Sequence, residues 1–168
     1  VYSDVHMGNT GEIVANECNI SREKMDSFAA RSQNKAAEAE ANGWFDWERF
    51  DMPELSIDEG VRAGTTAEKL AGLKPVFQDD GMVTAGNASG VVDGAAAVVL
   101  KSASRAAKDG DSPIAKIVSW GVVGLEPAIM ANGPVPSSRL ALERAGLTVD
   151  DIDRWEINEA FSGQLVAC

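Results

Sequence analysis

Residues 81–94 limit the fold of this chain more than any other part of the sequence. They hold four glycines among small polar residues and continue directly into the apolar run of residues 95–100. Small residues allow one backbone to approach another closely. The apolar run has the length of a buried strand. The segment therefore predicts a tight turn followed by a strand inside a layered protein.

The same glycine-rich segment is the leading candidate for a ligand site, because amides without bulky side chains can approach a phosphate or a thioester carbonyl. It is not a named phosphate motif, since it lacks the Gly-Lys-Ser/Thr ending of a P-loop. Asn87 stands where a Gly-x-Ser-x-Gly nucleophile elbow around Ser89 would need a glycine. Taken alone, the pattern favours a structural turn over a site.

Capping residues and apolar periodicity predict six helices. The first begins at Thr10, with Asn9 and Glu12 as a capping box, and the second runs from Ser21 to about Asn42. The others are expected from Thr65 to before Pro75, at 102–108, at 137–145 and from Glu159 onward.

Strands are predicted at residues 95–100, 115–120 and 154–158, between these helices. Residues 43–64 have no sustained period and predict an irregular excursion of the kind that often serves ligands. Alternating strands and helices favour an α/β layered fold. A turn around Asp111 predicts a domain boundary there.

Charge and cysteine content exclude several function classes. The 168-residue chain has 26 acidic and 15 basic residues, a formal charge of −11 that argues against a nucleic-acid partner. No apolar run reaches the length of a membrane span. With only Cys18 and Cys168, we expect a soluble intracellular protein without a disulfide framework. We also expect that the chain, which runs from Val1 to Cys168, is cut at both ends.

Individual reactive residues carry weak signals. His6 is the only histidine, and a lone histidine is more often packed or exposed than catalytic. Cys18 follows Glu17, whose charge disfavours the thiolate, so a passive thiol is expected. Asn158 lies at the predicted junction of strand and helix, where it would either cap the helix or polarise a carbonyl.

Five segments, taken in order, resemble the thiolase family. They are HMGNTGEIVA from His6, SREKMDSFAARSQNKA from Ser21, VTAGNASGVVDGAAAVVL from Val83, NGPVP from Asn132 and NEAF from Asn158. The resemblance spans almost the whole chain, and the third and fifth segments are specific to this family and its close relatives.

The resemblance implies an incomplete thiolase-like αβαβα fold built from two similar halves, with most of the inserted loop domain that covers coenzyme A. Residues 1–110 would be the loop domain and the end of the N-terminal half. Residues 111–168 would begin the C-terminal half.

The resemblance also assigns roles to eleven residues. Those expected along the pantetheine tunnel or acyl pocket are His6, Met7, Ala85, Ser89, Val91, Met130, Ala160 and Phe161. Arg62 would lie near the adenine and phosphate end, where Lys69 replaces a serine that many members carry. Asn158 resembles the residue that holds a water in the oxyanion hole, and it would stabilise an enolate-like thioester oxygen.

The implied reaction is a ping-pong acyl transfer, in which two acyl-CoA molecules, expected to be acetyl-CoA, condense or CoA cleaves a 3-ketoacyl-CoA. CoA is then a substrate, and no metal or other cofactor is expected. The nucleophilic cysteine would lie before Val1, and a Gly-His-Pro histidine and a second cysteine would lie after Cys168. A homodimer or homotetramer in the cytoplasm, or in an organellar matrix, is expected for the full-length protein.

Two alternatives stay open. One is a non-catalytic relative that binds acyl-CoA or lipid. The other is a subunit whose site a second polypeptide completes. Flanking sequence that carries the two cysteines and the histidine would favour the enzyme over the non-catalytic relative. A copurifying polypeptide that carries those residues would favour the subunit.

Overall fold

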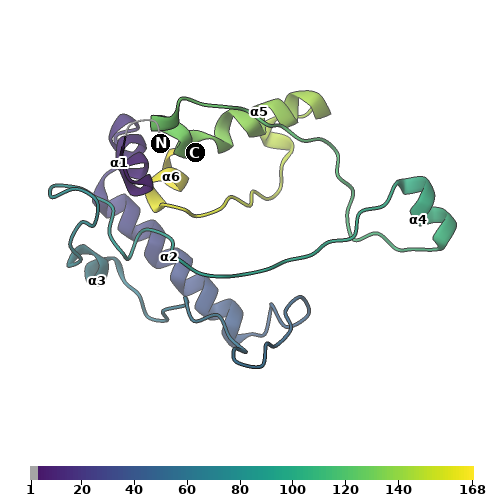
Figure 1. The fold of residues 1–168 in the computed structure, drawn as a ribbon, viewed down its shortest axis with the longest axis horizontal. Coiled ribbons are helices and arrows are strands. Elements are labelled where there is room, and N and C mark those ends of the chain that lie inside the picture. The colour runs from purple at the N-terminus through teal and green to yellow at the C-terminus, as the bar shows by residue number, and fades with distance from the viewer. Residues whose placement is uncertain (1–3) are drawn as a thin grey trace.

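The computed structural model describes residues 4–168 as a group of packed helices from which long extended segments depart (Figure 1). The helices are α1 (Met7–Glu17), α2 (Arg22–Ala41), α3 (Ala67–Ala71), α4 (Ala103–Asp109), α5 (Pro134–Ala145) and α6 (Ser162–Ala167), with short 3-10 helices η1 (Pro127–Asn132) and η2 (Val149–Asp151). Helices α1, α2, α3 and α6 gather at one end, whereas α4 lies at the far tip of an extended excursion. Among residues 4–168, no helix has the length and apolar content to cross a membrane.

Helix α1 begins three residues before the predicted start at Thr10. The Nδ1 atom of His6 accepts a hydrogen bond from the Gly8 amide at 3.1 Å and caps the helix. The predicted capping box is wrong because the carboxylate of Glu12 binds amides far along the chain instead of the Asn9 backbone.

Helix α2 confirms its prediction at both ends. Ser21 is the N-cap and accepts a hydrogen bond from the amide of Lys24. Asn42 follows the last turn, and Gly43 takes a positive φ of 65°, a conformation that a glycine adopts without strain.

Three other helices follow their predictions with shifted ends. Thr66, not Thr65, caps α3 through the Lys69 amide. Helix α4 lies close to its predicted range, from its Ser102 cap onward. Helix α5 starts at Pro134 instead of residue 137, because proline fits the first helical position, where no amide hydrogen bond is lost.

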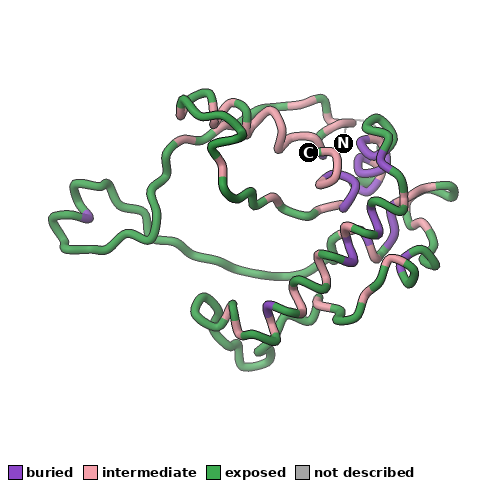
Figure 2. The backbone as a smooth tube through the Cα atoms, turned by 180° about the vertical axis from the view of Figure 1, so that it is seen from behind, coloured by how far each residue is buried: buried purple, intermediate pink, exposed green. Residues whose placement is uncertain are grey.

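The three predicted strands are wrong. Residues 95–100, 115–120 and 154–158 are extended but belong to no ladder, and residues 4–168 contain only three isolated β-bridges. A strand needs a neighbour that pairs its amides and carbonyls, and the described residues place none beside these segments. Most of these residues are exposed, and residues 91–100 entirely so (Figure 2). Helix α6 also starts at Ser162, three residues after the predicted Glu159.

The main apolar core lies where α1, α2 and α6 meet. Its buried members are Ala15, Ile20, Met25 and Val83, and Phe77 and Phe161 pack against them. Val83 comes from the start of the glycine-rich segment, so this segment is anchored in the core.

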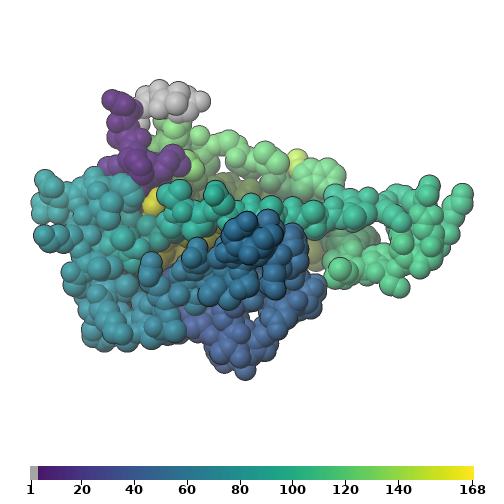
Figure 3. All heavy atoms as spheres, turned by 60° about the horizontal axis from the view of Figure 1, so that its bottom comes forward, coloured from purple at the N-terminus to yellow at the C-terminus, as the bar shows by residue number. Residues whose placement is uncertain are grey.

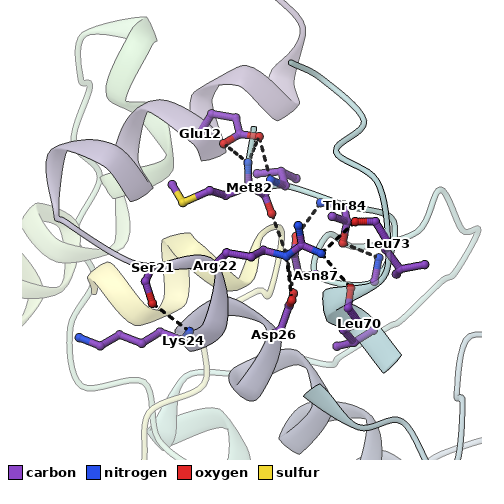
Figure 4. Close-up of polar contacts among 12 residues, drawn as sticks. Glu12, Ser21, Arg22, Lys24, Asp26, Leu70, Leu73, Met82, Thr84 and Asn87 are labelled. Carbon is purple, nitrogen blue, oxygen red and sulfur yellow. Dashed lines mark hydrogen bonds and ion pairs between the residues drawn. The ribbon is translucent and has the colours of Figure 1, made fainter. Parts of the chain in front are cut away.

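A buried carboxylate fixes the entry to the glycine-rich segment. Glu12, only 1% exposed, accepts hydrogen bonds from the amides of Met82 at 2.9 Å and Val83 at 2.8 Å (Figure 4). Because one carboxylate binds two amides that no ladder pairs, it ties α1 to the start of this segment.

Asn87 clamps the turn that follows. Its Oδ1 accepts from the Thr84 amide at 2.8 Å, while its Nδ2 donates to Met82 O at 3.0 Å and to Asp26 Oδ1 at 2.9 Å. The guanidinium of Arg22 donates to Asp26 Oδ2 at 2.7 Å and also to the carbonyls of Leu70 in α3 and of Leu73 just after it (Figure 4). One polar network therefore joins the turn to α2 and α3.

We predict that Met25→Ala lowers the free energy of unfolding by about 2–5 kcal/mol, because Met25 is fully buried and the change leaves a cavity. Urea unfolding followed by circular dichroism measures this. The exposed Met52→Ala is the matched control and should change stability by less than about 0.5 kcal/mol. Equal effects of the two changes would contradict the assigned core.

We predict that Glu12→Ala destabilises the chain by about 1–3 kcal/mol, because it leaves two amides without their acceptor. Hydrogen exchange of the Met82 and Val83 amides should accelerate. Glu17→Ala, on an exposed turn of the same helix, should leave both exchange rates unchanged. Unchanged exchange in Glu12→Ala would show that the carboxylate does not hold this segment.

Candidate functional site

An aromatic row lies along α1. The His6 ring stacks on Phe77 with centroids 4.7 Å apart, and Phe161 meets Phe77 edge-on at 6.4 Å. Two glycines make room for these rings. A Cβ atom at Gly8 would lie 2.2 Å from the Phe77 ring, and one at Gly11 would lie 2.8 Å from that of Phe161.

The glycine-rich segment joins the start of α6 directly. The Ser89 amide donates to the carbonyl of Ala160 at 2.9 Å, and Ala88 forms an antiparallel bridge with Phe161. Since Phe161 also belongs to the aromatic row, four predicted site residues, His6, Ser89, Ala160 and Phe161, lie in one connected region.

A hollow of about 210 Å³ lies between α2 and the glycine-rich segment. Residues 86–90 line it together with side chains of α2, including Ser32, and with Glu159 and Ser162. Ser32 Oγ donates to Glu159 Oε2 at 2.5 Å, and the buried Ser162 Oγ has no hydrogen-bond partner in the described part of the chain. Glu159 is the only charged residue among those that line the hollow.

Arg62 and Lys69 lie on exposed segments beside α2. The Arg62 amide donates to Gln33 Oε1 at 2.8 Å, and Gln33 lines the hollow. Lys69 Nζ donates to the carbonyl of Gly64 at 2.7 Å. The fold therefore places Arg62 beside the hollow, with Lys69 tied to the same surface loop.

Four other predicted residues are exposed. Met7 is the first residue of α1, and Ala85 lies in the turn that Asn87 clamps. Met130 belongs to η1, which packs against α1 and α6. Val91 lies beyond the turn on the extended segment. It is fully exposed and lies away from the other predicted site residues.

Asn158 is exposed and lies ahead of α6 without capping it. Phe161 occupies the N-cap position, and no side chain caps this helix. The capping explanation for Asn158 is therefore wrong, and its amide stays available for another role.

The two thiols do not have the surroundings of an activated nucleophile. Cys18 ends α1 and is exposed. Desolvation raises the pKa of Cys168, and the charge of nearby Cys18 raises it further, so its thiolate is disfavoured. Within residues 4–168, no group of three or more His, Cys, Asp or Glu side chains is arranged to hold a metal ion.

The sequence patterns missed three residues at this site. No sequence pattern singles out Phe77, and Glu12 is expected only as part of the capping box with Asn9. Glu159 was expected to start α6. Each owes its position to a partner more than sixty residues away in sequence, and no local pattern signals such a contact.

Family models and solved structures resemble this chain over nearly its full length. The model described as "Thiolase, N-terminal domain" matches residues 1–104, and that described as "Thiolase, C-terminal domain" matches residues 111–168. A crystal structure of Bacillus anthracis acetyl-CoA acetyltransferase covers 99% of this chain with a TM-score of 0.92 at 43% identity. A human mitochondrial 3-ketoacyl-CoA thiolase in complex with CoA covers 96%, also with a TM-score of 0.92, at 44% identity.

Curated relatives give the same result. The acetyl-CoA acetyltransferase of Cupriavidus necator is 48% identical over 176 residues, which cover 99% of this chain and 45% of that protein. The acetyl-CoA acetyltransferase of Shinella zoogloeoides is 46% identical over 170 residues, which cover 96% of this chain and 43% of that protein. The chain thus spans less than half the length of these relatives, and its fold is that of an incomplete thiolase. Matches of this extent and identity place the chain in the thiolase family.

Proposed function

We propose that this chain is part of a thiolase-type acyltransferase that condenses two acetyl-CoA molecules or cleaves a 3-ketoacyl-CoA with CoA. One structural observation supports this most: Ser89, Ala160 and Phe161 are joined by backbone contacts. Relatives are named acetyl-CoA acetyltransferases, and one similar structure is described as a complex with CoA. CoA acts here as a substrate.

The chemistry of the hollow supports a pantetheine site. Its lining is neutral apart from Glu159, so it suits an uncharged amide chain better than a phosphate. The unpartnered Ser162 hydroxyl offers such a chain a hydrogen bond. Ser89 lines the hollow itself. We assign the rest of the tunnel wall to the other residues expected there that the fold leaves near it, namely His6, Met7, Ala85, Met130, Ala160 and Phe161, whereas the exposed Val91 lies away from them.

Two cations suit the charged end of CoA. Arg62 is exposed and its backbone binds Gln33 beside the hollow, so its guanidinium can reach a phosphate outside it. Lys69 is exposed on the neighbouring surface, although its ammonium group must leave the Gly64 carbonyl to meet a phosphate.

Asn158 is assigned to the oxyanion hole. Its amide donates to a water or to the thioester oxygen as negative charge develops there, and it transfers no proton. A cysteine thiolate must accept the acyl group, and neither Cys18 nor Cys168 suits that role. We therefore assign the nucleophile, the Gly-His-Pro histidine and the second cysteine to sequence outside residues 1–168.

The same proposal includes the domain division, oligomeric state and compartment of the full-length protein. Residues 1–110 form the loop domain and the end of the N-terminal half, and residues 111–168 begin the C-terminal half. We propose a homodimer or homotetramer, in the cytoplasm or an organellar matrix.

We predict that the purified 168-residue chain does not cleave acetoacetyl-CoA, because it lacks an activated nucleophile and its base. Consumption of acetoacetyl-CoA with and without CoA measures this, and a full-length acetyl-CoA acetyltransferase serves as the positive control. CoA-dependent cleavage by this chain alone would contradict the assignment of its cysteines.

We predict that Ser89→Ala weakens the binding of both CoA and pantetheine by about three- to tenfold, because Ser89 lines the hollow and the change removes a hydroxyl that can bind the ligand through one hydrogen bond. Arg62→Ala should weaken CoA binding and leave pantetheine binding unchanged, because pantetheine carries no phosphate. Ligand-observed NMR measures the affinities, with Ser104→Ala on α4 as the matched control.

Equal losses for both ligands in Arg62→Ala would contradict the placement of the phosphate end. The same NMR measurement with a free fatty acid tests the non-catalytic lipid-binding alternative. Binding of a fatty acid as tight as that of acyl-CoA, and unchanged in Ser89→Ala and Arg62→Ala, would favour that alternative.

A further inference from the structure

A loop after α2 exposes several large apolar side chains, two of them Trp residues. We name residues 44–59 the acidic-aromatic loop. Trp47 is 76% exposed and Phe50 is 80% exposed. Trp44, Met52, Leu55 and Ile57 are exposed as well. Several large exposed apolar side chains within one short loop are a candidate interaction site.

Local contacts hold this loop against the end of α2. The Trp44 amide donates to Ala39 O at 3.0 Å, and the Arg49 guanidinium donates to both carboxylate oxygens of Glu40 at 2.5 and 3.1 Å. The same guanidinium lies 5.3 Å from the centre of the Phe45 ring. The backbone is therefore anchored while its other large side chains stay in solvent, and the loop bulges from the face shown in Figure 3.

The charge of the loop limits what can cover these side chains. Six carboxylates interleave with the apolar residues, at positions 46, 48, 51, 54, 58 and 59. Arg49 is the only cation of the loop, and Glu40 already neutralises it. Anionic lipid headgroups and nucleic acids are repelled by such a surface. A cationic polypeptide with apolar side chains matches both its charge and its apolar character.

The shape of the backbone argues for docking through side chains. The loop consists of turns, and its only ladder contact is the isolated bridge between Met52 and Leu55, so it presents no strand edge to a partner. By contrast, the extended residues 91–100 carry one carboxylate, Asp93, and offer mainly backbone. An apolar stripe flanked by Lys and Arg is what an amphipathic basic helix presents.

We propose that the acidic-aromatic loop is a docking surface for a basic amphipathic helix of a partner protein. Trp47 and Phe50 pack against its apolar stripe, and Glu48 and Asp51 pair with its flanking cations. The proposal is independent of CoA chemistry and requires no residue of the hollow.

The test uses the 168-residue chain and a fluorescein-labelled 18-residue peptide of Lys and Leu, patterned as an amphipathic helix. Fluorescence anisotropy should show saturable binding that weakens as salt rises. Trp47→Ala together with Phe50→Ala should weaken binding at least tenfold, since buried aromatic anchors dominate such interfaces. Glu48→Gln together with Asp51→Asn should weaken it at least threefold.

Two controls separate docking from general attraction to an acidic protein. Glu143→Gln together with Asp150→Asn removes the same charge from the α5 and η2 region and should leave binding unchanged. A scrambled peptide of equal composition, which cannot form an apolar stripe, should bind at least tenfold more weakly. Circular dichroism confirms that each variant keeps its helices.

Three results would overturn the proposal. The first is absence of peptide binding. The second is equal binding of the scrambled peptide, or an equal loss in the α5 and η2 control variant. The third is a different occupant, shown by Trp47-dependent binding of the chain to phosphatidylcholine vesicles or by Trp47-dependent self-association in sedimentation velocity.

Discussion

The position of the glycine-rich segment depends on the carboxylate of Glu12. It is buried and reaches from α1 to two successive amides at the entry to the glycine-rich segment. The described residues form no sheet, so these amides have no ladder partner and the carboxylate takes its place. Four to five residues later, the side chain of Asn87 holds the turn and donates a hydrogen bond to Asp26 of α2. These side-chain contacts fix where the turn lies relative to α1 and α2, and backbone hydrogen bonds join it to the start of α6.

That position matters because the turn carries the candidate site. Its backbone binds the carbonyl of Ala160 through the Ser89 amide, and Phe161, the N-cap of α6, belongs to the aromatic row along α1. The glycines of α1 permit this row, since a side chain at Gly8 would collide with Phe77. The polar network and the backbone contacts thus bring α2, the glycine-rich segment and the start of α6 together around one hollow.

Local sequence patterns predicted the features that depend only on neighbouring residues, such as helix ends. Ser21 and Gly43 mark the ends of α2 as expected, because capping hydrogen bonds and a left-handed glycine involve only neighbouring residues. The resemblance to thiolases in the glycine-rich and NEAF segments gave the family, which the similar structures confirm. The prediction of a strand at residues 95–100 is wrong because a strand forms only beside a second strand that pairs with it, and the described residues place none there. Glu12 and Phe77 were missed because their partners are distant in sequence.

The most direct test of the account is to map pantetheine onto the chain by amide chemical shifts. The account predicts that shifts concentrate at Ser89, Ala160 and Phe161, with Phe77 responding across the aromatic row, and that Glu12→Ala abolishes the pattern while α2 stays folded. Shifts that cluster on another surface, or a pattern that survives in Glu12→Ala, would contradict the claim that the anchored glycine-rich segment forms the CoA site.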